Sequence, residues 1–237
     1  MRRRQKLFIL KFAVFGALLT GFIFLANRYI PRQHLPWRSL DIHAPTGFAT
    51  DIQLLRLSLS PSSSCAKVIE SARDYHTSLA EKFRPQNPCG WNIARNVNGS
   101  DAVMLTPEDV TMQCPLAVGT YIWMNELERA ADEHLGSGIE SIRHAGAYSC
   151  RRQVGNNSGK WSEHAYANAF DILGFELENG SYVSVLKDWD GDKSKRDFLR
   201  DARKQACKIF RVTLSPDFNA AHADHFHVDM GPTTSCR

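Results

Sequence analysis

The chain has 237 residues, of which 43% are apolar and 23% are charged. This length allows one substantial domain with a tail or two small domains, and the apolar content excludes wholesale disorder. The formal charge of +4 is unevenly spread, because eight cations precede the first acid, Asp41, and leave 21 basic against 25 acidic residues. A nucleic-acid-binding domain carries its cations on its folded face, so that class of function is excluded.

One long apolar segment follows the basic N-terminus. Residues 7–26 contain a single charge, Lys11, and a helix of this length matches a bilayer core of about 30 Å. The basic residues 2–6 predict that residues 1–6 form a cytoplasmic tail and that the rest is exported. A cleaved signal peptide is the alternative. The absence of a clear small-x-small cleavage site favours an uncleaved transmembrane anchor.

Six cysteines agree with export, and none forms a Cys-x-x-Cys pair, which excludes a zinc ribbon or a thioredoxin-type motif. An even count in an oxidising compartment predicts three disulfides. Sequence alone does not choose among the pairings. The expected pairs are Cys65 with Cys89, Cys114 with Cys150, and Cys207 with Cys236.

The exported part divides into a linker and one domain. Residues 27–60 contain Pro31, Pro36 and Pro45 and show little periodicity, so we expect a linker there. The folded domain is expected to span residues 61–237, starting near Cys65. Its patterns predict helices at 65–83, 114–135 and 194–210, strands at 139–150, 169–177, 182–186, 211–214 and 225–230, and a polar, turn-rich stretch at 153–160. Asn179-Gly180 predicts a hairpin. The fold class is therefore α+β, with a small antiparallel sheet and flanking helices.

A His-x-His motif lies near the C-terminus. On a strand, His225, His227 and Asp229 would point to one face, and Phe226 and Val228 to the other. Imidazoles on one face of a rigid strand suit a metal or catalytic site. An exposed edge strand with chance histidines gives the same pattern.

A second candidate pair is His164 and Asp171. Their separation of seven puts them on opposite faces of a straight strand, but a turn between them would bring both to one point. A buried carboxylate needs a partner, and a capping Asp beside a surface His is the alternative. Combined with a later histidine, the pair supplies three N/O ligands and leaves a fourth position open, which is typical of catalytic zinc. A spare imidazole nearby can act as general base or stabilise an oxyanion.

This combination resembles the zinc peptidase superfamily of D-Ala-D-Ala carboxypeptidases, lysostaphin-type endopeptidases and the hedgehog signalling domain. Over roughly residues 60–237 the chain more closely resembles the bacterial extensin-like C-terminal family. The segments that carry this resemblance are Tyr148-Ser149-Cys150-Arg151, Ser162-Glu163-His164-Ala165, Ala169-Phe170-Asp171-Ile172, Leu186-Lys187-Asp188-Trp189, Phe198-Leu199-Arg200, Ala206-Cys207 and His222-Ala223-Asp224-His225-Phe226-His227.

The resemblance implies one Zn²⁺ per chain, held by His164, Asp171 and His227. His225 matches the catalytic histidine that is not a ligand. His222 matches a further histidine in the penicillin-insensitive murein endopeptidase branch.

The sequence also offers residues that could bind substrate or support the proposed ligands. Arg151 matches an arginine that meets substrate in the carboxypeptidase branch, and Arg152 beside it is the alternative. Ser162 is expected to hydrogen-bond near the site. Asp224 or Asp229 is expected to orient a histidine.

One departure from the carboxypeptidase branch is informative. That branch has a Glu shortly before its last ligand, where this sequence has Asp224 and His225. The departure favours the histidine-based branch and argues against a strict D-Ala-D-Ala dipeptidase.

The sequence therefore predicts a zinc-dependent hydrolase that cleaves amide bonds in the peptide part of peptidoglycan, as a carboxypeptidase or an endopeptidase. It would sit in the inner membrane by a single pass, with its domain in the periplasm. A non-hydrolytic, metal-containing module that binds cell-wall peptides or a partner protein is the main alternative, and a scaffold with a vestigial site is a third. The complete ligand set with a spare histidine favours the enzyme.

Overall fold

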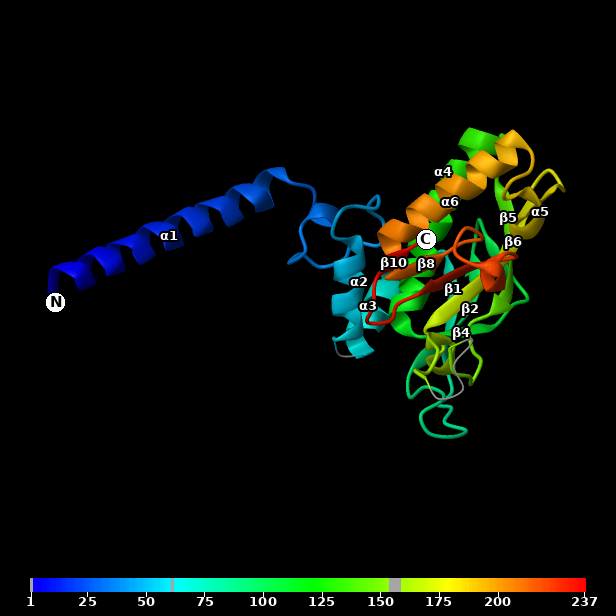
Figure 1. Ribbon diagram of the computed structural model, residues 1–237, viewed down its shortest axis with the longest axis horizontal. Coiled ribbons are helices and arrows are strands. Elements are labelled where there is room, and N and C mark those ends of the chain that lie inside the picture. Colours follow the sequence, from blue (N-terminus) through cyan, green and yellow to red (C-terminus); the bar gives the residue numbers. More distant parts are fainter. Residues whose placement is uncertain (1, 61, 154–158) are drawn as a thin grey trace.

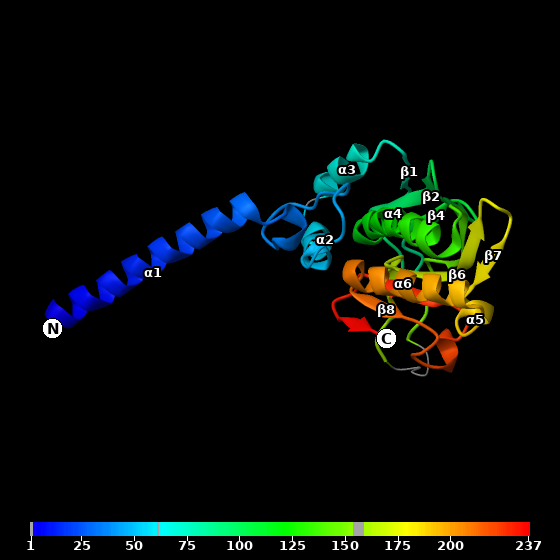
Figure 2. The ribbon, with the colours of Figure 1, turned by 90° about the horizontal axis from the view of Figure 1, so that it is seen from above.

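Two long helices pack side by side against a ten-stranded sheet in the computed structural model of the chain (Figures 1 and 2). The structure describes residues 2–60, 62–153 and 159–237. The α-helices are α1 Arg2–Tyr29, α2 Thr50–Ser58, α3 Ser62–Ser71, α4 Cys114–Leu135, α5 Val185–Asp188 and α6 Lys193–Ile209. Short 3-10 helices are η1 Arg32–His34, η2 Glu163–Tyr166 and η3 Ala220–His222. The strands are β1 Tyr75–Ala80, β2 Ala94–Ser100, β3 Met104–Thr106, β4 Val110–Met112, β5 Ile139–Gly146, β6 Ala169–Leu177, β7 Tyr182–Ser184, β8 Val212–Leu214, β9 Phe226–Asp229 and β10 Ser235–Cys236.

The sheet is large and mixed. Its strand order is β1-β2-β3-β5-β6-β9-β8-β10, with β4 paired to β2 and β7 paired to β6. The pairs β3–β5 and β8–β10 are parallel, and the long helix α4 provides the crossover that a parallel β3–β5 pair requires. The α+β class is confirmed, but the expectation of a small antiparallel sheet is wrong. The sequence patterns did not predict the short strands at residues 94–112, because this largely polar stretch, which includes Gly99, lacks a clear alternation of apolar and polar residues.

Several elements match their sequence patterns. The helix expected at 114–135 is α4, and Gly136 ends it in the left-handed conformation at φ 61°. The expected hairpin is β6–β7. The helix expected at 65–83 is wrong beyond Ser71, because residues 75–80 pair with β2 as strand β1, and this tertiary pairing overrides the local pattern. Of the turn-rich stretch at 153–160, residues 154–158 lie outside the described residues, as does the expected first residue of the domain, Pro61.

The helix α1 stands away from the domain (Figure 1). Its stretch Leu7–Tyr29 is long and apolar enough to cross a membrane or to serve as a signal sequence. The residues that follow, 30–60, form what we call the collar. The collar was expected to be a linker, but Ile42 and the fully buried Leu54 of α2 belong to the hydrophobic core of the domain.

Three disulfides are present: Cys65–Cys114, Cys89–Cys150 and Cys207–Cys236. The last was predicted, and the other two expected pairs are wrong because their partners are exchanged. The prediction paired the cysteines in the order in which they occur along the chain. In the structure, α3 lies against the start of α4, and the loop after β1 packs on the segment after β5. These packings bring the Cα atoms of each bonded pair to within 6 Å: 5.9, 5.6 and 5.5 Å.

The core lies between the sheet and the helices α4 and α6. Trp123 of α4 packs edge-on against Phe175 of β6 and donates a hydrogen bond from its ring nitrogen to the Ala202 carbonyl of α6. On β9, Phe226 and Val228 are fully buried in this core. The alternation of a strand therefore turns the intervening residues of β9 to the opposite face of the sheet.

Burial of the collar predicts a measurable contribution to stability. Leu54→Ala should lower the free energy of unfolding by about 2–5 kcal/mol, because it leaves a cavity in the core. Leu59→Ala removes the same atoms from a residue that is 81% exposed and should have almost no effect. Denaturant unfolding of the two variants compares them. Equal effects would mean that the collar does not pack on the domain.

His144 predicts a dependence of stability on pH. The ring is nearly buried, donates from Nε2 to the Pro107 carbonyl at 2.7 Å, and accepts at Nδ1 from the Gly146 amide at 3.0 Å. Burial lowers the pKa of His144, so the unfolded chain takes up this proton first as the pH falls. The folded state then loses up to about 1.4 kcal/mol per pH unit below the ordinary histidine pKa.

His144→Gln should flatten this loss. Urea unfolding of both proteins at pH about 7.5 and about 5.5 measures it. Parallel losses in the two proteins would contradict the assignment.

Candidate metal centre

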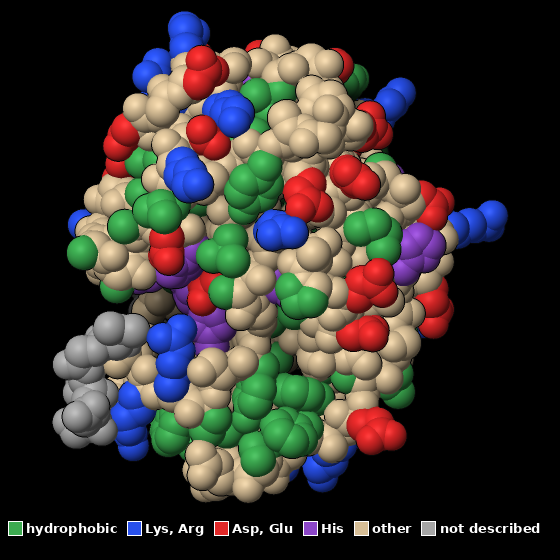
Figure 3. Space-filling view, turned by 90° about the vertical axis from the view of Figure 1, so that its right-hand side faces the viewer, with side chains coloured by type: hydrophobic (Ala, Val, Ile, Leu, Met, Phe, Trp, Pro, Cys, Tyr) green, Lys and Arg blue, Asp and Glu red, His purple; other side chains and the backbone are tan. Residues whose placement is uncertain are grey.

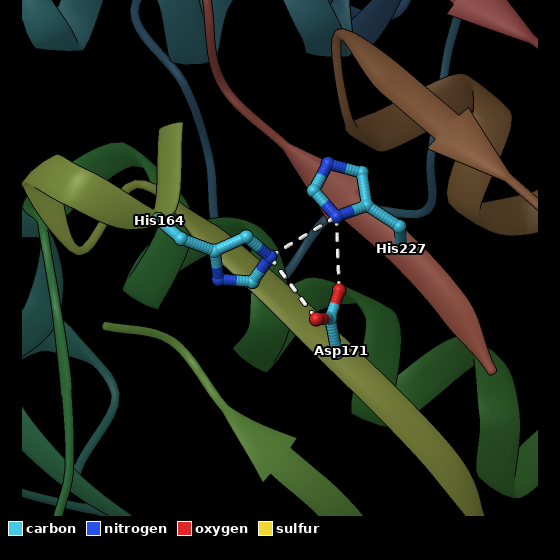
Figure 4. A group of neighbouring side chains, drawn as sticks. All are labelled: His164, Asp171 and His227. Carbon is cyan, nitrogen blue, oxygen red and sulfur yellow. Dashed lines mark hydrogen bonds and ion pairs between the residues drawn. The ribbon is translucent and has the colours of Figure 1, made fainter. Parts of the chain in front are cut away.

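Three side chains from two strands and one turn converge on one point (Figure 4). Asp171 of β6 and His227 of β9 lie directly opposite each other in the antiparallel register. Their atoms Oδ1 and Nδ1 are 2.9 Å apart. His164 Nε2 lies 3.1 Å from Asp171 Oδ2 and 3.2 Å from His227 Nδ1. The structure thus brings together the three residues that the sequence singled out as metal ligands.

A tight turn carries His164 to the strands. It belongs to η2, which Ser162 caps by accepting a hydrogen bond from the His164 amide at 3.3 Å. Ala167 ends the turn with φ 55°, in the left-handed region. This is the reversal that the odd spacing between His164 and Asp171 required, and it places both side chains on the same face of the sheet.

Hydrogen bonds on the outer sides of the two rings fix which nitrogen faces inward. His164 Nδ1 lies 3.3 Å from the Ala147 carbonyl, and His227 Nε2 lies 3.1 Å from Asp229 Oδ2. Both partners are acceptors, and Asp171 is a second acceptor at the inner nitrogens, so the protons lie on the outer nitrogens alone once a cation replaces an inner proton. The inner nitrogens, Nε2 of His164 and Nδ1 of His227, then present lone pairs.

Those lone pairs and the Asp171 carboxylate repel one another unless a proton or a metal cation lies among them. The three ligand atoms lie within 4.8 Å of one another. Two imidazole nitrogens and one carboxylate oxygen are a donor set that suits Zn²⁺ and leaves a fourth position for water or substrate. Oriented outer hydrogen bonds are the usual support of metal-binding histidines. The residues therefore fit the zinc ion that the sequence predicts.

The same geometry controls the protonation of the cluster. Burial acts to raise the pKa of Asp171, but the close approach of His164 and His227 outweighs it and holds the pKa well below its usual range. Burial acts to lower the pKa of His227, but the Asp171 and Asp229 carboxylates outweigh it and raise the pKa to about 9. Without an ion, His227 is therefore protonated at neutral pH and pairs with Asp171, and a metal cation bound among the three groups would displace that proton.

Two further histidines flank this group. His225 Nδ1 lies 2.8 Å from Asp224 Oδ1, and His225 Nε2 lies 3.7 Å from Asp171 Oδ1. The ring of His222 is 5.1 Å from that of His225, and its Nδ1 contacts Asn219 at 2.7 Å. Burial, followed by the nearby imidazoles, lowers the pKa of His222 to about 4. His222 is therefore neutral at neutral pH.

The two arginines are used differently. Arg151 is half-exposed at the rim, with a guanidinium nitrogen 3.9 Å from Asp171 Oδ2. Arg152 stacks its guanidinium on the Trp161 ring at 4.6 Å and bonds the Gly159 carbonyl. Arg151, rather than Arg152, is therefore the arginine that contacts the ligand group.

Sequence reasoning missed two parts of the surroundings. The Ala147 carbonyl acts through the main chain, which leaves no side-chain signal. An aromatic cluster of Phe83, Trp91 and Tyr148, with ring centroids 5.1–5.5 Å apart, lies beside the segment that leads to Arg151. A correct prediction of the Cys89–Cys150 disulfide would have indicated that the segments around these two cysteines lie together, but both cysteines were assigned to other partners.

The centre opens on the face of the domain that is turned away from α1. Figure 3 views the side of the molecule opposite to the side from which α1 extends in Figure 1, and histidine side chains gather in a hollow there. The rings of His222, His225, His227 and His164 form the group of mutually close histidines. The hollow is therefore the mouth of the candidate centre.

A second group of possible ligands is Glu133, His134 and Asp201, on α4 and α6. Arg129 lies 3.1 Å from Glu133 and 3.5 Å from Asp201. This guanidinium already supplies the positive charge that the carboxylates need, so we assign no site there.

Comparison with known families agrees with the motifs. Residues 63–237 match the family described as extensin-like protein C-terminus, so the chain belongs to this family. Neither the curated proteins nor the solved structures contain a match.

The outer hydrogen bonds predict which aspartate supports metal binding. Asp229→Asn should weaken zinc binding about 10–100-fold, because it removes the carboxylate that orients His227. Asp224→Asn is the matched control, since Asp224 contacts His225 and not a candidate ligand. Competition against a chelating dye measures both affinities. An equal loss in both variants would refute the assigned ligand set.

Proposed function

We propose that this member of the extensin-like family is a zinc-dependent hydrolase that cleaves an amide bond in the peptide part of peptidoglycan. The observation that carries the proposal is the inward-facing set of His164, Asp171 and His227 with a spare histidine, His225, beside it. The order of these residues along the chain is similar to that in the zinc peptidase superfamily, and this similarity supports the choice of a peptide bond.

The ligand set defines where chemistry would take place. His164, Asp171 and His227 would hold the ion, with Ala147 and Asp229 keeping the two rings in the required tautomer. Zinc in such a set lowers the pKa of a water molecule and polarises a carbonyl group. Because the face opens into a hollow, an extended peptide can reach the ligands from outside (Figure 3).

His225 is placed to move the proton. Its Nδ1 proton is donated to Asp224, so its Nε2 lone pair faces the same point as the ligands. It would accept a proton from the attacking water and return it to the departing amine nitrogen. His222, neutral and adjacent, supports the position of the His225 ring.

Arg151 is placed to bind substrate. Its guanidinium is at the rim, and its main chain is fixed because the Ser162 amide donates to the Arg151 carbonyl at 3.1 Å. The neighbouring Cys150 is tied to Cys89. A guanidinium held in this way can donate two hydrogen bonds to a peptide carbonyl or carboxylate.

The proposed location is the periplasmic side of an inner membrane. The three disulfides support an oxidising compartment, and α1 supports attachment to a membrane.

Because the proposed metal ligands and the proposed general base are different residues, their substitution should cause different defects. His225→Ala should keep zinc but reduce kcat by about 10²–10⁴, because only proton transfer is lost. His164→Ala should lose both zinc and activity. Products from purified peptidoglycan, identified by mass spectrometry, and the zinc content of each variant measure the two effects.

Two outcomes would count against this assignment. Full activity in His225→Ala would remove the proposed base. Tight binding of cell-wall peptides without any cleavage by the zinc-loaded wild type would favour a non-hydrolytic binding module.

A further inference from the structure

The collar is a folded element with a fixed place on the domain. Ile42 and Leu54 enter the core, and the Thr46 amide and hydroxyl both donate to Glu126 of α4, at 3.2 and 3.0 Å. Within the collar, the Gln53 side-chain amide donates to the carbonyls of Arg32 and Leu35, each at 2.9 Å. Its exposed side chains therefore have a fixed direction relative to the domain.

The collar begins where the apolar helix ends. The Trp37 ring nitrogen donates to Asn27 of α1 at 3.2 Å, and Ala26 of α1 is buried. Arg32 opens η1 three residues after the apolar stretch ends at Tyr29. Three residues span at most about 10 Å, so a membrane crossed by α1 would lie next to the collar.

Large apolar side chains of the collar face solvent. Phe48 is 91% exposed, Trp37 is 43% exposed and Ile52 is 40% exposed. Phe48 is tied to the turn nearest α1, because its amide donates to His34 Nδ1 at 3.1 Å and its ring lies 5.2 Å from the His34 ring. Exposed aromatic residues next to an apolar span are typical of a membrane interface.

The charge of this region also suits a membrane surface. The collar contains three arginines and two acids, Asp41 and Asp51. Asp51 faces a domain cation, Arg211, at 3.6 Å. Arginines near a bilayer are attracted to anionic phospholipid headgroups, while residues 61–237, with 20 basic and 23 acidic residues, are not drawn to the same surface by their net charge.

We propose that the collar is a membrane-docking surface that seats the domain on an anionic phospholipid bilayer, with Phe48, Trp37 and Ile52 in the interface. The proposal rests on α1 crossing the membrane and is independent of the hydrolase proposal. Because the candidate metal centre opens on the face turned away from α1, a seated collar holds that centre facing away from the bilayer (Figures 1 and 3).

Tryptophan quenching tests the docking of the collar. The full chain, carrying Trp37→Phe to remove the one tryptophan of the collar, is reconstituted into nanodiscs of phosphatidylglycerol brominated near the headgroup. Phe48→Trp in this background places a reporter in the collar. Leu186→Trp is the matched control, since Leu186 is 58% exposed on α5 of the domain. Thermal unfolding confirms that both variants are folded.

The reporter at position 48 should lose at least about half of its added fluorescence, and the reporter at 186 should lose none. The loss should diminish in phosphatidylcholine discs. Equal quenching at both positions, no quenching at either, or a chain that fails to enter the discs would overturn the proposal. Protection of position 48 by a second copy, seen as a cross-linked dimer, would also overturn it.

Discussion

The candidate centre depends on one cross-strand pair, Asp171 opposite His227. Both strands send their neighbouring residues, such as Phe170 and Phe226, into the core, and this burial fixes the register of β6 against β9. A slip of one residue would exchange the buried and the functional faces, so core packing and site geometry are specified by the same interaction. His164 then needs only a short turn to complete the group.

Hydrogen bonds orient the buried polar groups around this pair. Two rings and a carboxylate are held within hydrogen-bonding distance of one another, and the outer partners Ala147 and Asp229 keep the inner nitrogens available. Such a cluster is costly to bury unless a cation completes it. The collar lies next to the helix α1, whereas the hollow with the candidate centre lies on the face turned away from α1 (Figures 1 and 3). The surface near the proposed membrane helix is thus separate from the surface that carries the proposed chemistry.

Residue alternation and spacing predicted several local features, while the choice of ligands came from the family resemblance. The opposite faces of Phe226 and His227, the turn after His164 and the helix ending at Gly136 all follow from local rules. The extent of the sheet, the buried Leu54 in the collar and two of the disulfide pairings did not, because they depend on contacts between segments far apart in the chain. The role of the Ala147 carbonyl had no side-chain signal at all.

X-ray absorption at the zinc edge, on the purified full chain supplied with zinc at neutral pH, shows whether His164, Asp171 and His227 bind the ion. We expect one zinc per chain, bound by two imidazole nitrogens and carboxylate or water oxygens, and loss of this two-imidazole signal in His227→Ala. Absence of bound zinc, or a bound ion without imidazole ligands, would contradict it.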